Sequence, residues 1–171
     1  MGRFLLGIVI GVVLAPLAVV GAARAGLLSL TATASPPAWE ARLGRTALHA
    51  SAARGAKSVF RSASATVTEE DLGTGLRLYR MNCSGCHGDF GRPSAWGTTS
   101  FFPRVPQFAE HPSTLTPREM FFVVQNGVRY SGMGAWKSLM SDSDIWRVVS
   151  FVGRIRSLPP SVEERWKHPP Q

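Results

Sequence analysis

The chain opens with an uncharged, mostly apolar run, residues 4–23. Twenty helical residues span about 30 Å, the thickness of the hydrocarbon core of a bilayer. We therefore predict a transmembrane helix, with residues 1–25 as a membrane anchor. The triplet Ala23-Arg24-Ala25 also has the form of a signal-peptidase site, so a cleaved signal peptide stays open as the alternative. The length of the apolar run favours the anchor.

A basic segment, residues 26–67, follows and forms a predicted tether. Within it Trp39, Leu43 and Ala47 recur every four residues after a Ser-Pro-Pro start, which indicates an amphipathic helix. Such a segment has more than one interpretation: a helix that lies on an anionic lipid surface, a tether helix that packs on the main domain, or a loose linker. The small, polar stretch 61–67 is typical of a hinge or boundary.

Three later helices are predicted from their first residues. Thr68, Thr116 and Ser141 each precede an acidic residue three positions on, the pattern of a capping box, and each is followed by apolar positions at helical spacing. These stripes include Leu72, Leu76 and Tyr79 in the first helix, and Ile145, Val148, Val149, Val152 and Ile155 in the last. No segment alternates like a strand, so the predicted fold class is all-α.

The predicted main domain spans residues 68–160, and residues 161–171 form a C-terminal tail. Between the first and second helices of this domain lies a stretch, 88–115, rich in Gly, Pro and Ser. A loop of that length is uncommon inside a compact domain unless something other than the polypeptide occupies the centre.

Charge is distributed unevenly along the chain. The formal net charge is +8, but residues 1–67 carry seven of the 19 Lys and Arg residues and one of the 11 acids. The basic excess therefore belongs mainly to the N-terminal third. A nucleic-acid-binding domain carries its charge on the folded face, so we expect no nucleic acid partner.

The only two cysteines stand in the motif Cys83-Ser-Gly-Cys86-His87. A redox dithiol has its Cys-x-x-Cys at the start of a helix that follows a strand, whereas here a helix precedes the motif. A structural zinc site needs a fourth ligand, and only the distant His111 offers one. Cys-x-x-Cys-His is otherwise the attachment motif for haem c, with two thioether bonds and the histidine as an iron ligand. We expect one covalent haem here.

A second axial ligand is expected downstream of the motif. Met133 lies between two glycines, which let the backbone approach a flat macrocycle closely, and its thioether suits low-spin iron. Met81, Met120 and Met140 are weaker candidates: the first adjoins the motif, the second lies in a predicted helix core, and the third precedes the last helix. The other histidines, His49, His111 and His168, lie in polar or proline-rich surroundings.

The stretches "GLRLYRMNCSGCHG", "NGVRYSGMGAW" and "LMSDSDIWRVVSFVGRIRSLP" resemble class I, single-haem bacterial cytochromes c, near the cytochrome domains that accompany respiratory oxidases. The resemblance covers about residues 70–158. It implies a small helical domain wrapped around the haem. It also implies that Gly75 and Tyr79 pack against an aromatic residue of the last helix, either Phe151 or Trp146.

The resemblance implies further site residues and a setting. A proline-containing loop would place a backbone carbonyl near the free nitrogen of His87, and Pro106 is chosen over Pro103 for this role. The expected partners are redox proteins or subunits of a membrane complex, with residues 4–23 in the membrane. Because haem is attached to this motif on the exported side, we expect the bacterial inner membrane with the haem domain on the periplasmic side.

These observations predict one-electron transfer by a tethered haem c with His87 and Met133 as axial ligands. Two alternatives stay open: a haem subunit of a larger respiratory or oxidoreductase complex, and a haem enzyme with an open iron site. We expect an electron carrier or electron-transfer subunit rather than an enzyme by itself.

Overall fold

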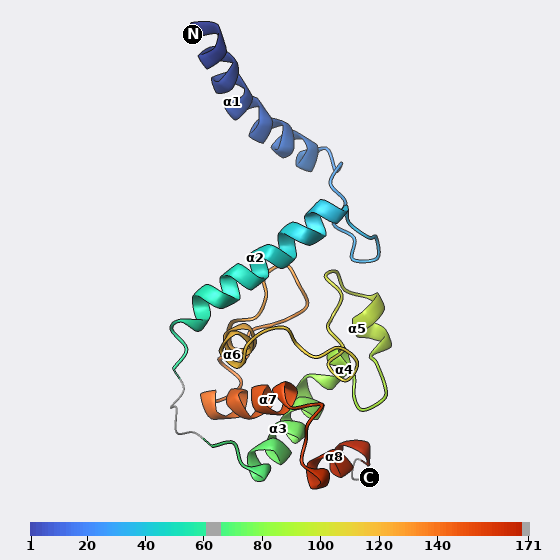
Figure 1. The fold of residues 1–171 in the computed structure, drawn as a ribbon. Coiled ribbons are helices and arrows are strands. Elements are labelled where there is room, and N and C mark those ends of the chain that lie inside the picture. Colours follow the sequence, from blue (N-terminus) through green and yellow to red (C-terminus); the bar gives the residue numbers. More distant parts are fainter. Residues whose placement is uncertain (61–65, 169–171) are drawn as a thin grey trace. The chain divides into compact units, whose positions relative to one another are not determined.

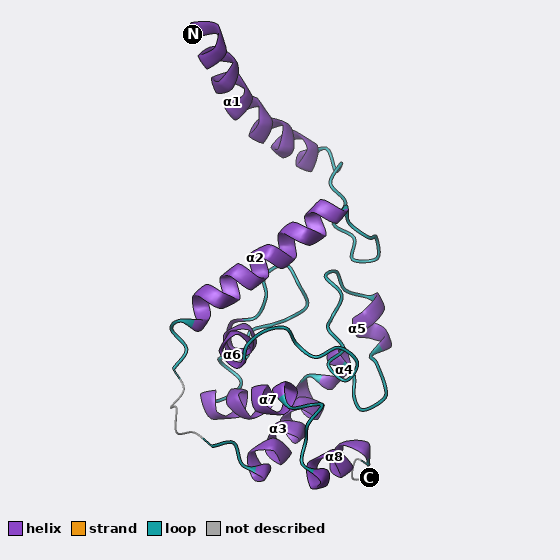
Figure 2. Cartoon of the chain, in the orientation of Figure 1, coloured by secondary structure: helices purple, strands orange, loops and turns teal. Residues whose placement is uncertain are grey.

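The computed structural model describes residues 1–60 and 66–168, which contain helices and no strand (Figures 1 and 2). The all-α prediction is confirmed. Residues 61–65 of the predicted hinge lie outside the described residues. The helices are α1 (Gly2–Arg24), α2 (Ala38–Ala56), α3 (Glu69–Asn82), α4 (Ser84–His87), α5 (Ala95–Thr99), α6 (Pro117–Asn126), α7 (Asp142–Gly153) and α8 (Pro160–Lys167).

The chain divides into two compact units, Met1–Ala34 and Ser35–Gln171. The predicted division into an anchor (1–25), a tether (26–67), a main domain (68–160) and a tail (161–171) stays a prediction. The first unit contains α1, which covers the predicted membrane anchor. Across the residues that the structure describes, no helix combines the length and apolar character that crossing a membrane requires. The side chains at positions 3, 5, 6, 8 and 9 of the predicted anchor lie outside the described residues.

Helices α3 and α7 form the centre of the second unit. The expected capping box begins α3: the Asp71 amide donates to the Thr68 hydroxyl at 3.1 Å, and the Thr68 amide donates to the Asp71 carboxylate at 3.2 Å. Tyr79 packs on Phe151 with ring centroids 5.3 Å apart, and both side chains are fully buried. The expected aromatic contact is therefore confirmed, with Phe151 as the partner.

A glycine lets α3 and α7 approach closely. A Cβ atom added at Gly75 would lie 2.2 Å from the carbonyl oxygen of Arg147 and 3.0 Å from Cβ of Phe151. No side chain fits at that distance, so the sequence needs glycine where the two helices cross.

Helix α6 links this core to α2. It begins at the predicted position, with Thr116 as N-cap and Pro117 in the first turn, and ends at Gly127. Phe121 of α6 stacks on Trp146 with ring centroids 4.4 Å apart. On its other side α6 contacts α2, where Ala52 is buried. The predicted helix therefore packs on the main domain through the face that contains Ala52 (Figure 1). The expected apolar stripe does not form this contact, because Trp39 and Leu43 are 67% and 61% exposed.

The C-terminal tail contains a helix that the sequence analysis did not predict. The sequence Leu158-Pro159-Pro160 predicts the end of the preceding helix. In the structure α7 ends earlier, at Gly153, and Pro160 begins α8. Val162 and Trp166, one turn apart, are buried in the core that α3 and α7 share. Proline is favoured in the first turn of a helix because its missing N–H has no intrahelical partner there.

Candidate cofactor site around the cysteine motif

The cysteine motif lies in one turn of helix directly after α3. Cys83 ends α3 and precedes α4, and the amides of Cys86 and His87 both donate to the carbonyl oxygen of Cys83, at 3.1 and 2.9 Å. Residues three and four positions apart share one face of a helix, so the two sulfurs and the imidazole face the same side. Both cysteines are free and half-buried. This is the arrangement that two thioether bonds and an adjacent ligand require.

The thiol of Cys83 does not have the properties of a redox dithiol. Burial, with a smaller contribution from Cys86, raises its pKa to about 12. Reactive dithiol cysteines instead have lowered pKa values, since the thiolate is the attacking species. Both the preceding helix and the raised pKa therefore disfavour the dithiol alternative.

His87 is held by two residues of the loop that follows the motif. Its Nδ1 lies 2.9 Å from the carbonyl oxygen of Pro106, and its ring stacks on Phe108 with centroids 4.6 Å apart and planes 8° apart. Burial lowers the pKa of His87, and the hydrogen bond to Pro106 offsets part of that effect. A neutral imidazole that donates through Nδ1 keeps its Nε2 lone pair for a metal ion.

The backbone that follows His87 is also fixed. The buried Tyr79 hydroxyl lies 2.8 Å from the carbonyl oxygen of Gly88 and 3.2 Å from that of His87, and donates toward both. Burial raises the pKa of Tyr79, so its phenol stays protonated as a donor. Tyr79 therefore packs α3 against α7 and also fixes the backbone at the end of the cysteine motif.

Gln107 is a site residue that the sequence analysis missed. Its side chain is buried, and its amide nitrogen donates to the carbonyl oxygens of Cys86, at 3.0 Å, and Val105, at 2.9 Å. Its amide oxygen accepts from the Ser94 amide at 2.7 Å. Gln107 thus joins the loop that contains Pro106 to the motif and to the start of α5. A lone glutamine in a polar stretch gives no sequence signal for such a role.

Residues 88–115 are mainly loop, as expected, and contain one short helix, α5 (Ala95–Thr99). This helix lies directly against the motif: a Cβ atom at Gly97 would sit 1.9 Å from the carbonyl oxygen of Cys86. The Ser94 hydroxyl caps α5 by accepting from the Gly97 amide at 2.9 Å. The segment after the motif is therefore ordered by short-range contacts to the motif itself.

The methionines occupy different environments. Met120 is buried in the core, as expected, Met140 packs against the core, and Met81 is exposed. Met133 is half-buried in the loop after α6, where the Val128 amide donates to its carbonyl oxygen at 2.9 Å. The role of Met133 as a distal ligand stays a prediction. His49, His111 and His168 are exposed.

The donor set fits haem c better than a zinc ion. Within the described ranges, no group of three or more His, Cys, Asp and Glu side chains is placed to hold a metal ion. A zinc site would need four converging ligands. Two thiols and one oriented imidazole on a single helical turn are instead the protein's contribution to a covalent haem.

The comparisons with known proteins agree with this assignment. Residues 70–152 match the family described as cytochrome C oxidase, cbb3-type, subunit III. The match begins in the first turn of α3 and ends within α7, so it contains the motif, Pro106 and Met133 but not α8. No curated protein matches the chain.

Proposed function

We propose that residues 70–152, which match this family, form a class I cytochrome c domain that transfers electrons through one covalent haem c and is tethered to a membrane. The observation that carries the proposal is the geometry of His87. Its Nδ1 faces the Pro106 carbonyl at 2.9 Å, so Nε2 remains to coordinate iron.

Each residue of the site has a distinct task. Cys83 and Cys86 supply the sulfurs of the two thioether bonds, and His87 supplies the proximal nitrogen. The haem supplies a one-electron couple at its iron, while the protein sets its burial, orientation and axial ligands. Phe108, stacked on the imidazole, shields the ligand from water and restricts its rotation.

Met133 is the proposed distal ligand. Met120 and Met140 are engaged in or against the core, and Met81 is 73% exposed on the helix that precedes the motif. The half-buried Met133 in the loop after α6 is therefore the best-placed thioether to complete the coordination. A thioether ligand raises the reduction potential relative to a second histidine.

The proposed partners are redox proteins or subunits of a respiratory oxidase complex. The description of the matching family supports the second of these settings. Under this proposal the haem accepts one electron from a donor and passes it to an acceptor, with no substrate bound at the iron.

The membrane tether is proposed from the sequence. The run 4–23 has no charged residue, and α1 covers it as one helix of 23 residues. We place the protein in the bacterial inner membrane with residues 26–171 on the periplasmic side, because haem attachment takes place there. If the tether is correct, high salt leaves the protein in the membrane fraction, and protease added to spheroplasts removes the haem domain. A mature N-terminus at Gly26 would identify a signal peptide instead.

A redox titration of the purified protein, combined with ligand binding, tests the proposed function. We expect a reversible one-electron transition and no binding of carbon monoxide to the reduced iron, since both axial positions are occupied. Rapid carbon monoxide binding would indicate an open iron site and favour the haem-enzyme alternative. The absence of any haem would overturn the proposal.

A further inference from the structure

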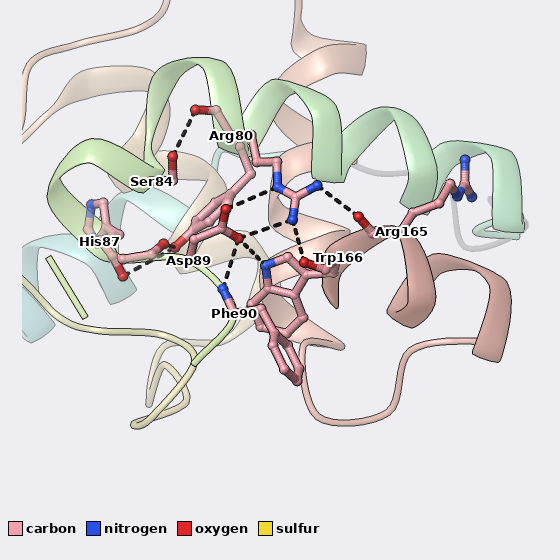
Figure 3. A network of polar contacts seen from close by, with 9 residues as sticks. Arg80, Ser84, His87, Asp89, Phe90, Arg165 and Trp166 are labelled. Carbon is pink, nitrogen blue, oxygen red and sulfur yellow. Dashed lines mark hydrogen bonds and ion pairs between the residues drawn. The ribbon is translucent and has the colours of Figure 1, made fainter. Parts of the chain in front are cut away.

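The carboxylate of Asp89, two residues after His87, accepts hydrogen bonds from side chains of α3 and α8 and from the next residue in the chain (Figure 3). It accepts from Nε of Arg80 at 3.1 Å and from the amide of Phe90 at 2.9 Å. It also accepts from the indole N–H of Trp166 in α8. The Arg80 and Asp89 side chains are only 17% and 20% exposed, so water screens this ion pair weakly.

Arg80 attaches the end of α8 to the same cluster. Its Nη1 donates to the carbonyl oxygen of Arg165 at 2.8 Å, and its Nη2 donates to that of Trp166. Carbonyl groups in the last turn of a helix have no intrahelical partner, and a cation is favourable at that end. Arg80 therefore caps α8 and pairs with Asp89 at once.

Trp166 is fixed by packing as well as by its hydrogen bond. The indole is 4% exposed and meets two rings edge-on, that of Phe151 at 5.5 Å and that of Phe90 at 5.1 Å. Phe90 follows Asp89 directly, so Trp166 contacts two consecutive residues of the segment after the proximal histidine. Helix α8 lies outside the segment that matches the cytochrome family.

The backbone of residues 88 and 89 connects His87 to these contacts. The Tyr79 hydroxyl donates to the carbonyl oxygens of His87 and Gly88. The hydrogen bonds to the Asp89 carboxylate fix the next two residues, Asp89 and Phe90. The C-terminal side of the ligand is thus fixed by α3 and α8, and Pro106 and Phe108 contact its ring.

We propose that Trp166 is a positioning residue for the proximal ligand. Its indole N–H, donated to Asp89, fixes residues 88–90 and thereby the rotational setting of the His87 ring at the iron. This inference rests on the proposed function, in which His87 ligates the haem. Groups that act on a metal ligand through its hydrogen-bonded surroundings tune the metal although they do not touch it. A hydrogen bond to a partly buried carboxylate is stronger than one between neutral groups.

Trp166→Phe in the full-length, haem-loaded protein tests the proposal. The variant removes the indole donor and keeps an aromatic ring against Phe151 and Phe90. We expect hydrogen exchange at the Phe90 amide to accelerate about tenfold, because one hydrogen bond to the acceptor carboxylate is lost. We also expect a change in the NMR spectrum of the oxidised protein, in the range of chemical shifts of the haem methyl groups. This range reports the orientation of the imidazole plane.

Two further variants separate positioning from stability. Val162→Ala removes packing from the buried face of α8 but leaves the hydrogen bonds, so it should lower Tm and keep the wild-type haem-methyl pattern. Asp89→Asn keeps the shape of the side chain but removes the charge, and should change the pattern in the same way as Trp166→Phe.

The outcomes separate this inference from the proposed function. A haem-loaded wild type with an unchanged haem-methyl pattern in both Trp166→Phe and Asp89→Asn would overturn the positioning role alone. A pattern that changes equally in Val162→Ala would show that α8 acts through stability, which also contradicts the inference. A wild-type protein without covalent haem would overturn the proposed function itself.

Discussion

The carbonyl oxygen of Pro106 lies 2.9 Å from Nδ1 of His87, although the two residues are 19 positions apart in the chain. The loop that supplies this carbonyl is held in place by the buried side chain of Gln107, which joins it to Cys86 and Ser94. The orientation of the proposed iron ligand therefore depends on a residue that contacts neither the iron nor the imidazole.

Gln107→Ala should destabilise the domain. It removes the hydrogen-bond partner of half-buried backbone groups at Cys86, Val105 and Ser94. Each such loss costs about 1–3 kcal/mol at a fully buried group. We expect the free energy of unfolding, measured by urea denaturation, to fall by about 2–4 kcal/mol, because water replaces part of the lost hydrogen bonding at these half-buried groups. Gln125→Ala, which removes an exposed hydrogen bond to Asp142, should change it by less than about 0.5 kcal/mol. Equal effects of the two variants would contradict the structural role of Gln107.

Met133→Ala tests the distal ligand. Loss of the thioether should abolish the weak far-red absorption of the oxidised protein, lower the reduction potential and let small ligands bind the iron. The covalent haem should remain, because Cys83, Cys86 and His87 are unchanged.

Met140→Ala is the matched control for the distal ligand. Because Met140 packs against the core, its truncation should cost about 2 kcal/mol of stability without changing the far-red band. Loss of the band in Met140→Ala but not in Met133→Ala would show the ligand assignment to be wrong. An unchanged spectrum in both variants would direct attention to His111.

Gly75→Ala tests the close crossing of α3 and α7. The added methyl group would lie 2.2 Å from the carbonyl oxygen of Arg147, so the helices must separate. We expect a loss of about 3 kcal/mol or more, at the upper end of overpacking substitutions, seen as a lower Tm by circular dichroism. At Gly44 in α2 an added Cβ meets nothing within 4 Å, so Gly44→Ala should leave stability unchanged or raise it by up to about 1 kcal/mol. A Tm for Gly75→Ala at the wild-type value would contradict the observed crossing.

The capping box of α3 predicts that part of the domain's folding stability is lost at low pH. Hydrogen bonds from the Thr68 backbone and hydroxyl, followed by one from Arg147, lower the pKa of Asp71. A lowered folded-state pKa means that the unfolded chain binds the proton more tightly. The stabilisation is therefore complete above the ordinary carboxyl range, about pH 4–5, and is lost as pH falls through the lowered value.

Asp71→Asn should reduce this dependence. Urea denaturation at several pH values between 7 and 3.5 should show a smaller loss of stability on acidification in the variant than in the wild type. Glu70→Gln removes a carboxylate from the same helical turn without touching the capping hydrogen bonds, and should keep the wild-type acid dependence. If Asp71→Asn retains the full acid dependence, the capping carboxylate is not its source.

Local signals made much of the fold predictable. The starts of α3, α6 and α7 follow from Thr68, Thr116 and Ser141, because a cap and its acidic partner lie within four residues of each other. Helix α8 is not predicted from the sequence, because the pair Pro159-Pro160 indicates the end of a helix as readily as the start of one. The four-residue spacing of Val162 and Trp166 was the available signal for it.

The residues of the site likewise divide into those that a local sequence pattern predicts and those that it does not. Cys83, Cys86 and His87 are contiguous, so their common face follows from helical geometry alone. The hydrogen bond between Asp89 and Trp166 joins residues 77 positions apart, and no periodic pattern relates them. Such contacts arise when α8 packs on the core, and local sequence patterns do not predict that packing.

The intact mass of the wild-type protein, isolated from cells that attach haem to exported chains, tests the central claim most directly. The account predicts one haem added to the polypeptide, retained in denaturing acid and organic solvent because two thioether bonds hold it. The double variant Cys83→Ala, Cys86→Ala should show the mass of the polypeptide alone. A folded wild-type protein with the mass of the polypeptide alone, or with a haem that the solvent extracts, would contradict the account.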